Sequence, residues 1–575
     1  MSVAVLLKPE DKLKPAPRPA LAGGREVVVL KFGSSVLHGP EDTPAAASEI
    51  YGHVRQGRRV VAVVSAFGGE TDRLLGHARE LGLPHENLLA PAYVVQGEEQ
   101  AAALTALACD RVGLDAVALT VRELGLVAEG EPEHAHPRSL DDARLRQALE
   151  DHEVVVVPGF GAVTGEGRVV LLGRGGTDLT AAFLAAELGL KTVRLVKDVD
   201  GLYDRDPNNA DGALRYDRAS WETARRLGGS LVQRDAIDLG QARGVEIEVA
   251  ALGRAAATVV GDAEDAPHPA KPYQPVRVAV AGAGVVGGGL LKRLLNDPRF
   301  EVVSVLVRDP KKPRDFACPA GLFTASRADL LASDPHVVLE AMSEGQAGHD
   351  LIRAALDKGL DVVSANKQAI SIDPAGLNDL AWGTGARLAY SAAVGGGSPM
   401  IETLRLARAA GPVAGFEAVL NGTVNFMLER LAEGDAFEDA LAAARAAGFA
   451  EEDPSADLEG LDSAAKVRLL AYEAFGEAPE DLPLEALSPD APLGRRGVRQ
   501  IGACHARGDK LEARVALESD LDPVFHDLKG ERNALKVYGQ DGRVWTCKGR
   551  GAGRWATAES VLADLSDIVR IRQGL

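Results

Sequence analysis

Acidic and basic side chains are concentrated between Gly448 and Lys466, in the stretch GFAEEDPSADLEGLDSAAK. Asp462 and Lys466 are four positions apart, so on a helix they lie on one face, with Asp457 in the turn that precedes it. The same helix continues with three apolar residues at helical spacing, Val467, Leu470 and Ala471. A partly buried lysine beside carboxylates can donate a proton to a substrate. Acidic residues also collect at solvated helix N-termini, so this stretch alone leaves both interpretations open.

The composition is that of an ordinary globular protein with several domains. The chain has 575 residues, of which 46% are hydrophobic and 26% are charged. Its formal net charge of −19 disfavours binding to nucleic-acid phosphates, and the early apolar run at 3–7 is too short for a signal sequence. The four cysteines form no CxxC pair, which argues against a zinc site or a disulfide framework. We therefore expect a cytoplasmic protein that binds small molecules, and neither a nucleic acid nor a membrane.

Strands that alternate with helices and end in glycine-rich turns predict a parallel α/β sheet at residues 25–260, after a flexible tail at 1–24. The first strand, VVVLKF, runs into a turn that contains Gly33 and Ser34 beside the cation of Lys31. Such a turn exposes backbone N–H groups. It can therefore bind phosphate.

A later turn, in LLGRGGTDLTAA, places Arg174 and Asp178 between a strand and a helix. With KFGSSV, VVSAFGGETDRL, QGEEQAAA, PGFGAV and KDVDGLYDRDP, this order of segments resembles the aspartokinases of the amino-acid kinase family. The resemblance implies that Lys31 holds the transferred phosphoryl group, that Glu98 binds the substrate amine, and that Arg174 binds the substrate carboxylate. It also implies that Asp178 orients these groups and that the KDVDGLY loop, which contains Asp198, lines a site for ATP with magnesium.

Three features differ from the aspartokinase pattern. The family's KFGGTSV is shortened to KFGSSV, Lys197 stands where a threonine usually precedes the DVDG loop, and Ser230 stands where a phosphate-side lysine is usual. No pair of regulatory ligand-binding modules is recognisable before the next domain. Two interpretations therefore stay open. The domain either phosphorylates L-aspartate with ATP, or is a non-catalytic domain that binds a ligand or a partner domain and regulates or stabilises the rest of the chain.

A proline-rich linker at 261–275 leads into a dinucleotide-binding pattern. The strand VRVAVA is followed by GAGVVG and an amphipathic helix, which is the context that a G-x-G-x-x-G fingerprint requires. The residues that we expect to contact the cofactor in this fingerprint are Gly282, Gly284, Val285, Val286 and Gly287.

The strand after this helix ends where a residue can recognise the ribose of the cofactor. Arg308 occupies that position and Lys311 follows closely, which favours the 2′-phosphate of NADP, whereas Asp309 keeps NAD open. Two further strands end beside the expected nicotinamide, at Ser343, Asn366 and Lys367.

The second half of the chain, residues 276–575, resembles homoserine dehydrogenase in the segments ANK, AVGGGSPMI, NGTVNF, GFAEEDPSADLEGLDSAAK and GRGAGRWATAESVLADLSDI. The resemblance implies the NAD(P)-dependent interconversion of L-homoserine and L-aspartate 4-semialdehyde, in threonine, methionine and isoleucine synthesis. It assigns Lys466 and Lys367 as the catalytic lysines, with Asp462 paired to Lys466. Reduction of an aldehyde requires a proton donor for the developing alkoxide, and a partly buried lysine suits that role.

The same resemblance assigns the amino end of the substrate to two carboxylates, Glu451 and Asp457, which supply the charge opposite to an ammonium. The polar turn with Gly422 and Thr423 either binds the substrate or caps a helix. The late GRGAGR turn, which contains Gly551, would close on the cofactor. A Rossmann oxidoreductase that acts on another amino-acid semialdehyde is a further interpretation, although the acid-rich stretch argues against a substrate without an amine.

The resemblance also predicts a Rossmann domain at 276–390 and an α+β catalytic and dimerisation domain at 391–575, whose end returns to the cofactor domain. We therefore expect a homodimer or a larger homo-oligomer. Ser391 stands where the family often has a glutamate near a monovalent cation. Such a cation would then be held by backbone atoms of Val394, Gly396 and Ser398.

Overall fold

The computed structural model describes most of the chain, in two compact units. The first unit consists of residues 1–109 and 116–271, and the second of residues 110–115 and 272–575. The tail at 1–24, Ser230 and Glu451 lie outside the described residues. The described ranges are 25–81, 88–206, 212–229, 231–270, 273–314, 316–319, 321–450, 453–489, 497–508, 510–519, 521–526 and 528–572.

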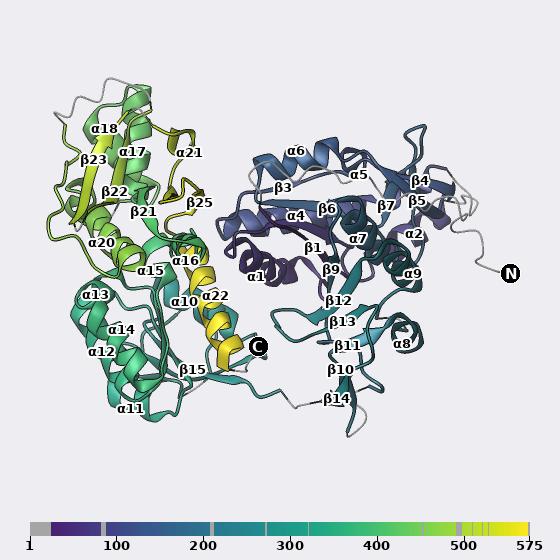
Figure 1. Ribbon diagram of the computed structural model, residues 1–575, viewed down its shortest axis with the longest axis horizontal. Helices are drawn as coiled ribbons and strands as arrows, with labels where there is room; N and C mark the ends of the chain where they lie inside the picture. Colours follow the sequence, from purple (N-terminus) through teal and green to yellow (C-terminus); the bar gives the residue numbers. More distant parts are fainter. Residues whose placement is uncertain are drawn as a thin grey trace. The chain divides into compact units, whose positions relative to one another are not determined.

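The first unit is built around an eight-stranded sheet with the strand order β11-β13-β12-β9-β1-β2-β6-β3 (Figure 1). All neighbouring strands are parallel except β12 and β13. Parallel strands need long crossover connections, which explains the helices between them. The strands are β1 (Val27–Phe32), β2 (Arg59–Val64), β3 (Ala116–Ala118), β6 (Val154–Pro158), β9 (Thr192–Lys197), β11 (Arg218–Ser220), β12 (Glu246–Ala251) and β13 (Ala257–Gly261).

Two smaller sheets complete the strands of this unit, a four-stranded sheet in the order β5-β4-β7-β8 and the pair β10-β14. The residues of β14 belong to the expected linker, and they pair antiparallel with β10. A two-stranded ribbon tolerates prolines because each strand has an unpaired edge. The strands are β4 (Leu126–Glu131), β5 (His134–Leu140), β7 (Gly161–Val163), β8 (Val169–Leu171), β10 (Leu214–Tyr216) and β14 (Pro267–Pro269).

Helix α7 (Gly176–Glu187) lies at the centre of the first unit, and each of its residues is buried. It packs against β1, β9 and α9. This packing places Asp178, in the first turn of α7, at the carboxyl ends of the central strands. The other helices are η2 (Pro40–Asp42), α1 (Thr43–Val54), α2 (Glu70–Glu80), α3 (Ala90–Val94), α4 (Gln96–Arg111), α5 (Val121–Leu124), α6 (Ala143–Asp151), α8 (Trp221–Leu227) and α9 (Arg234–Arg243).

The second unit begins with a six-stranded parallel sheet in the order β17-β16-β15-β18-β19-β20, which is the doubly wound fold predicted from the sequence. Its strands are β15 (Val276–Ala281), β16 (Phe300–Leu306), β17 (Phe323–Thr324), β18 (Val337–Glu340), β19 (Asp361–Ser364) and β20 (Leu388–Ala389). Its helices are α10 (Val285–Leu294), α11 (Arg327–Ala332), α12 (Gly345–Asp357), α13 (Lys367–Ser371) and α14 (Pro374–Thr384).

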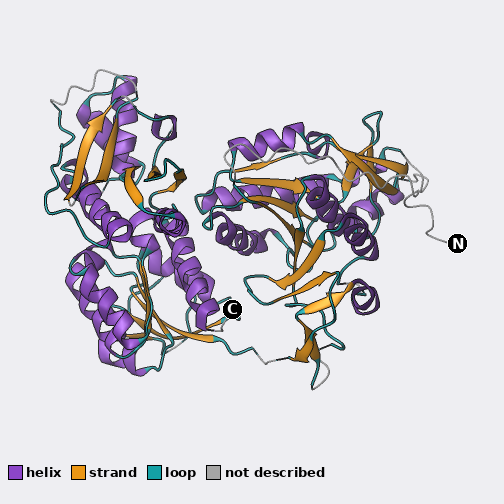
Figure 2. Cartoon of the chain, viewed as in Figure 1, coloured by secondary structure: helices purple, strands orange, loops and turns teal. Residues whose placement is uncertain are grey.

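An antiparallel sheet in the order β23-β22-β21-β24-β25 forms the rest of this unit, and Figure 2 shows helices beside it. The strands are β21 (Val413–Val419), β22 (Arg499–Arg507), β23 (Lys510–Glu518), β24 (Arg532–Gly539) and β25 (Val544–Arg550). The helices are α15 (Ser391–Gly395), α16 (Met400–Ala410), α17 (Gly422–Glu433), α18 (Phe437–Ala446), α19 (Ser455–Leu458), α20 (Leu461–Phe475), α21 (Pro523–His526) and α22 (Arg554–Arg572).

Two helices of the second unit are important for its site. Helix α20 packs against α13, which brings the end of β19 close to the middle of the charged stretch. Helix α22 packs against α10, and its buried residues join the apolar core under the dinucleotide-binding turn. Among the described residues, no helix has the length and apolar character needed to cross a membrane.

Candidate functional site

Asp462, in the first turn of α20, lies between two lysines. Its Oδ2 is 3.0 Å from Nζ of Lys466, one turn further along the helix. Its Oδ1 is 2.6 Å from Nζ of Lys367, the first residue of α13. Burial by itself would raise the pKa of Asp462, but the two ammonium groups outweigh burial and hold this pKa well below its usual range. Asp462 is therefore a carboxylate that fixes both lysines.

Lys466 is the more buried of the two lysines, with a side chain that is 11% exposed, against 34% for Lys367. Besides Asp462, Nζ of Lys466 donates a hydrogen bond of 2.7 Å to the carbonyl oxygen of Leu420. The amide of Asn533 donates to the same oxygen at 3.2 Å. An ammonium has three N–H groups, and these two partners occupy two of them. The third has no partner among the described residues and can bind an oxygen atom of a substrate.

Asn421 connects the second carboxylate of the charged stretch to this cluster. Its Nδ2 donates to Oδ1 of Asp457 at 2.7 Å and to Oδ2 of Asp462 at 3.0 Å. Its Oδ1 accepts from the backbone N–H of Val424, so the same side chain caps α17. The sequence indicated that the polar turn that begins with Asn421 binds a ligand or caps a helix, and the cap is confirmed, but we did not predict the bridge between the two carboxylates. The asparagine before Gly-Thr was the available signal, but it is equally typical of a helix cap.

Gly422 and Thr423, the next residues of this polar turn, contact other parts of the protein. The hydroxyl of Thr423 donates to the backbone oxygen of Phe449 at 2.7 Å. A Cβ atom on Gly422 would lie 3.0 Å from Cα of Glu531, so glycine permits a close approach of two backbones. The substrate contacts predicted for Gly422 and Thr423 stay predictions.

The predicted dinucleotide turn has the shape that a pyrophosphate needs. Gly282 has a φ of +96°, and a Cβ there would collide with the backbone oxygen of Ala341. A Cβ on Gly287 would collide with the backbone oxygen of Gly282, so this glycine lets α10 approach β15. A Cβ on Gly284 would meet nothing within 4 Å, which leaves open space at the N-terminus of α10. These residues fit a dinucleotide.

The other residues that were predicted to contact the cofactor differ in their exposure to solvent. Arg308, Lys311 and Ser343 are exposed at the carboxyl ends of the strands, as is Val285 at the start of α10, and Val286 beside it is half-buried. Asn366 is buried, and its amide nitrogen donates to Oε1 of Glu340 at 3.2 Å. Burial raises the pKa of Glu340, which also accepts from the hydroxyl of Ser364.

Asn366 thus has a structural role that the sequence did not indicate. Its Oδ1 accepts from the backbone N–H of Ala369 and caps α13, the helix that begins with Lys367. This pairing aligns Lys367 toward Asp462. A direct contact of Asn366 with the cofactor stays a prediction.

A second carboxylate with two lysines lies in the first unit. Nζ of Lys31, near the end of β1, is 2.6 Å from Oδ1 of Asp178. Nζ of Lys197, the last residue of β9, is 3.0 Å from Oδ2 of the same carboxylate. Burial and the nearby Lys31 lower the pKa of Lys197 to about 8. Burial acts to raise the pKa of Asp178, but both lysines outweigh it and lower this pKa.

Glu98, near the start of α4, is a buried carboxyl group in the same unit. It is 2% exposed, and its Oε2 has no hydrogen-bond partner among the described residues. Burial raises the pKa of Glu98 to about 8, although a backbone hydrogen bond from Ala66 and the charge of Lys31 act in the opposite direction. A buried acceptor without a partner is costly unless a ligand supplies the donor.

The remaining residues predicted for this site are on turns at the strand ends. Ser34, Arg174 and Asp198 are exposed. A Cβ on Gly33 would collide with Nζ of Lys31, so the glycine leaves room for that ammonium. Roles for Ser34, Arg174 and Asp198 stay predictions.

Comparisons with protein-family models divide the chain as the motifs do. Residues 26–248 match the amino acid kinase family, residues 282–390 match the NAD binding domain of homoserine dehydrogenase, and residues 399–566 match homoserine dehydrogenase. The homoserine dehydrogenase of Pseudomonas aeruginosa is 33% identical over 322 residues, which cover 52% of this chain and 73% of that protein. The chain belongs to the homoserine dehydrogenase family. It is an oxidoreductase of this family, and its residues 26–248 are similar to the amino acid kinase family.

Two further proteins are similar to parts of the chain. The aspartokinase of Geobacillus stearothermophilus is 30% identical over 226 residues, which cover 39% of this chain and 56% of that protein. The chain therefore spans about half the length of the aspartokinases that it matches. A solved homoserine dehydrogenase from Thiobacillus denitrificans is 29% identical with a TM-score of 0.49, and the match covers 52% of this chain and 74% of that one.

The turn predicted to hold a monovalent cation in the homoserine dehydrogenase half packs against the late glycine-rich turn. A Cβ on Gly396 would collide with the backbone oxygen of Gly551. Ser391 Oγ is 2.5 Å from Oε1 of Glu402 and 2.9 Å from Oδ1 of Asp564. Glu402 and Asp564 therefore place two carboxylates beside Ser391, which has no carboxylate of its own. The sequence did not indicate these two residues.

A backbone carbonyl group of this turn already accepts a hydrogen bond within the protein. The carbonyl oxygen of Ser398 accepts a hydrogen bond from the backbone N–H of Met400 at 2.8 Å. Within the described ranges, no group of three His, Cys, Asp or Glu side chains has the geometry of a metal site. A cation held by Val394, Gly396 and Ser398 stays a prediction.

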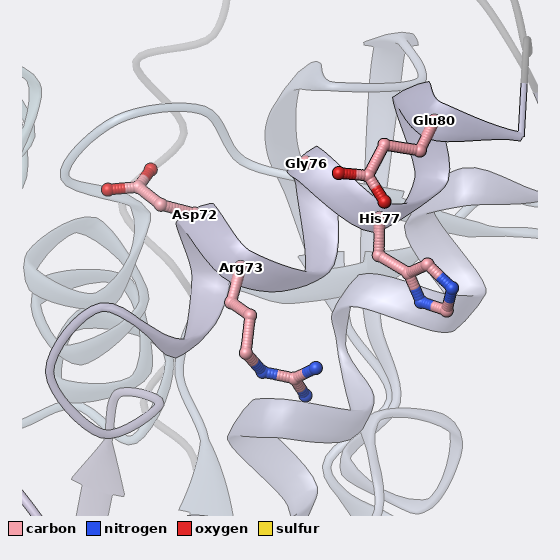
Figure 3. A pocket seen from close by; sticks show the side chains of 5 residues that line it. All are labelled: Asp72, Arg73, Gly76, His77 and Glu80. Atoms are coloured by element: carbon pink, nitrogen blue, oxygen red, sulfur yellow. The ribbon is translucent and has the colours of Figure 1, made fainter.

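An open hollow of about 460 Å³ lies on α2, and none of the clustered lysines lines it. Figure 3 shows that its lining side chains all come from this one helix. His77 is paired with the hydroxyl of Tyr93 at 2.6 Å, and Arg73 with Glu70 at 2.6 Å. Because two of the lining side chains are already paired with neighbouring residues, we assign no site here.

Proposed function

We propose that the second unit catalyses the NAD(P)-dependent interconversion of L-homoserine and L-aspartate 4-semialdehyde, and that the first unit phosphorylates L-aspartate with ATP and magnesium. The observation that supports the dehydrogenase reaction best is the convergence of Lys367 and Lys466 on the buried carboxylate of Asp462. Lys367 follows a strand of the dinucleotide-binding sheet, and Lys466 belongs to the catalytic domain. The two lysines therefore join the cofactor side to the substrate side of one site.

Lys466 moves the proton in this proposal. In the reducing direction its ammonium donates a proton to the carbonyl oxygen, which becomes the hydroxyl of homoserine. In the oxidising direction the neutral amine takes that proton back. A nicotinamide cofactor, when bound at the glycine-rich turn after β15, would supply the hydride chemistry of this reaction. Asp462 stays ionised and orients the amino groups of both lysines. Lys367 stabilises the developing alkoxide.

The substrate is an amino acid, so its ammonium needs an anionic partner. Asp457 has this role in our proposal, because Asn421 holds its carboxylate next to Asp462. Glu451 is a second candidate from the same stretch, although it lies outside the described residues. A substrate without the amine would leave a carboxylate without a partner and would bind weakly.

The preferred cofactor in our proposal is NADP. Arg308 and Lys311 are cations at the end of β16, where the 2′-phosphate of NADP would lie. The carboxylate of Asp309 accepts from the backbone N–H of Lys311 and is therefore part of the turn. We expect the KM for NADP to be lower than the KM for NAD.

A measurement of NADPH formation from homoserine and NADP by the purified chain tests the dehydrogenase proposal. We expect Lys466→Ala to lower the rate by about 100-fold or more, because it removes the proton donor. Lys358→Ala is the matched control, since Lys358 is exposed at the end of α12. An unchanged rate in Lys466→Ala would show that the proton donor is a different group.

Glu98 and the cluster of Lys31, Asp178 and Lys197 support the kinase proposal. Phosphoryl transfer needs cations and orientation more than covalent help from the protein. Aspartate-dependent ADP formation from magnesium ATP is the test, with Lys31→Ala as the variant that should abolish it. A chain that oxidises homoserine but forms no ADP would favour the alternative, in which the first unit is a non-catalytic domain.

The homodimer or larger homo-oligomer predicted from the resemblance remains a proposal. Light scattering on the purified chain during gel filtration gives its mass in solution. A mass equal to that of one chain would exclude a stable oligomer.

A further inference from the structure

Lys197 lies on the same face of the sheet as Lys31. In the parallel pairing of β1 with β9, Lys31 is opposite Leu195 and Phe32 is opposite Val196. Because side chains of a strand alternate between faces, Lys197 shares the face of Leu195 and therefore of Lys31. It is two positions beyond Leu195, toward the carboxyl end of the sheet. The two ammonium groups thus come to the same end of two neighbouring strands.

The buried cluster has more positive than negative charge. Lys31 is 6% exposed and Lys197 is 5% exposed, and Asp178 supplies one negative charge for the two ammonium groups. A buried charge without a counter-charge is strongly disfavoured. The surplus is therefore a reason for an anion to bind at this place. Oε2 of Glu98 does not offset this surplus positive charge through a hydrogen bond, since that atom has no partner among the described residues.

The surroundings suit a phosphoryl group. Asp178 is in the first turn of α7, a helix of twelve residues that begins at Gly176 and is preceded by Gly173 and Gly175. Gly33 leaves room beside the ammonium of Lys31. The backbone N–H of Gln233, at the start of α9, is 3.4 Å from Oδ2 of Asp178. Donors and cations from three segments thus surround one carboxylate.

We propose that Lys197 is a second catalytic lysine of the kinase reaction, which contacts the transferred phosphoryl group together with Lys31 while Asp178 positions both. This inference rests on the proposed kinase function. In the reaction a carboxylate oxygen of aspartate forms a bond to the γ-phosphorus of ATP, and the bond from that phosphorus to the bridging oxygen breaks. The electron pair leaves with ADP. Two cations stabilise the charge on the phosphoryl oxygens as this exchange occurs.

A purely structural role for Lys197 predicts a different result. If Lys197 only neutralises Asp178, its removal lowers the melting temperature but leaves the affinity for magnesium ATP and the turnover of the folded enzyme unchanged. If Lys197 contacts the phosphoryl group, both of these change whatever happens to the melting temperature.

The test uses the full chain and three variants. Lys197→Met removes the charge, and Lys197→Gln removes the charge but keeps a hydrogen-bond donor for Asp178. Lys191→Met is the matched control, because Lys191 is an exposed lysine just before the opposite end of β9. Calorimetric titration with magnesium ATP, aspartate-dependent ADP formation and thermal unfolding are measured on each protein. Homoserine oxidation by the same preparations shows that the second unit is intact, and thermal unfolding shows whether the first unit has folded.

We expect both Lys197 variants to form ADP at least about 100-fold more slowly than the unaltered chain and to bind magnesium ATP more weakly. Lys191→Met should equal the unaltered chain in each measurement. Wild-type affinity and turnover in Lys197→Gln would overturn the inference and leave the kinase function in place.

The other outcomes separate the inference from the proposed function. If the unaltered chain binds magnesium ATP but forms no ADP, and Lys197→Gln weakens that binding, the kinase function fails and the phosphate contact of Lys197 stands. If the unaltered chain neither binds magnesium ATP nor forms ADP, both proposals fall.

Discussion

At the scale of single residues, the two halves of the chain use the same electrostatic arrangement. Asp462 and Asp178 are buried carboxylates, and each pairs with two lysines that are distant from each other in the sequence. A buried carboxylate keeps its charge only when nearby cations outweigh the cost of burial. The carboxylate in turn determines where the ammonium groups lie. Pairing of this kind prepares a lysine for contact with a substrate that becomes more negative during its reaction.

Asp462→Asn should damage both the activity and the stability of the second unit. The variant keeps the volume but removes the charge between Lys367 and Lys466. We expect homoserine oxidation to fall by about 100-fold. We also expect a loss of about 3 kcal/mol in the free energy of unfolding at pH 7, because two ammonium groups lose their partner. Urea unfolding followed by circular dichroism measures this loss, with Asp357→Asn, an exposed position on α12, as the control.

The pH dependence of that loss has a definite sign. The pKa of Asp462 is lower in the folded state than in the unfolded chain, where it is about 4. Its contribution to stability is therefore present above about pH 4 and is lost as the pH falls further. The difference in stability between the unaltered chain and Asp462→Asn should shrink between pH 6 and pH 3. A constant difference over this range would contradict the pairing.

Glu98→Gln should show the opposite relation between stability and function. Burial raises the pKa of Glu98 to about 8, so the folded state holds a proton that the unfolded chain releases near pH 4. This group therefore costs stability increasingly as the pH rises from about 4 to about 8. The variant has no such cost, so its melting temperature should exceed that of the unaltered chain more at pH 8 than at pH 5. Aspartate-dependent ADP formation should be lost, because the amide cannot balance the charge of a substrate ammonium.

At the scale of elements, the turns between strands and helices carry the sites. The dinucleotide turn between β15 and α10 depends on two glycines for different reasons. A Cβ on Gly287 would collide with the backbone oxygen of Gly282, whereas a Cβ on Gly284 would meet open space. The first glycine therefore serves the packing of a helix on a strand, and the second leaves room for a ligand.

Two alanine variants should separate these roles. Gly287→Ala pushes α10 away from β15, so we expect a loss of about 2 kcal/mol in unfolding free energy together with weaker cofactor binding. Gly284→Ala should keep the stability of the unaltered chain but raise the KM for NADP at least about 10-fold, because its methyl group occupies the place of the pyrophosphate. Equal stabilities and equal KM values for the two variants would contradict this division of roles.

At the scale of the whole molecule, the two candidate sites belong to two compact units with separate cores. The lysines of each centre belong to one unit only. Each unit therefore has the residues for its own reaction.

Two variants should accordingly inactivate the two reactions separately. Lys31→Ala should abolish aspartate-dependent ADP formation and keep homoserine oxidation within about two-fold of the unaltered chain, since distant sites usually act independently. Lys466→Ala should do the reverse. Both rates are measured on the same preparation of each variant. A loss of both reactions in either folded variant would show that the two centres are coupled.

The amino-acid sequence by itself determined the local features of this protein. The spacing of Asp462 and Lys466 predicts one helix face because the period of a helix is 3.6 residues. The glycines after β15 predict a dinucleotide turn because a residue without a side chain permits both the tight turn at Gly282 and the close approach of a helix or a pyrophosphate. The order of such segments was enough to indicate both families, since each segment is contiguous in the chain.

Only the tertiary structure decided which distant residues meet. Lys367 joins Asp462 because α13 packs against α20, and Lys197 joins Asp178 because the register of β9 beside β1 brings it to the face of Lys31. The bridge that Asn421 makes and the burial of Glu98 also depend on residues far away in the chain. These pairings follow from strand register, helix packing and the removal of water, and none of the three can be read from the spacing of neighbouring residues.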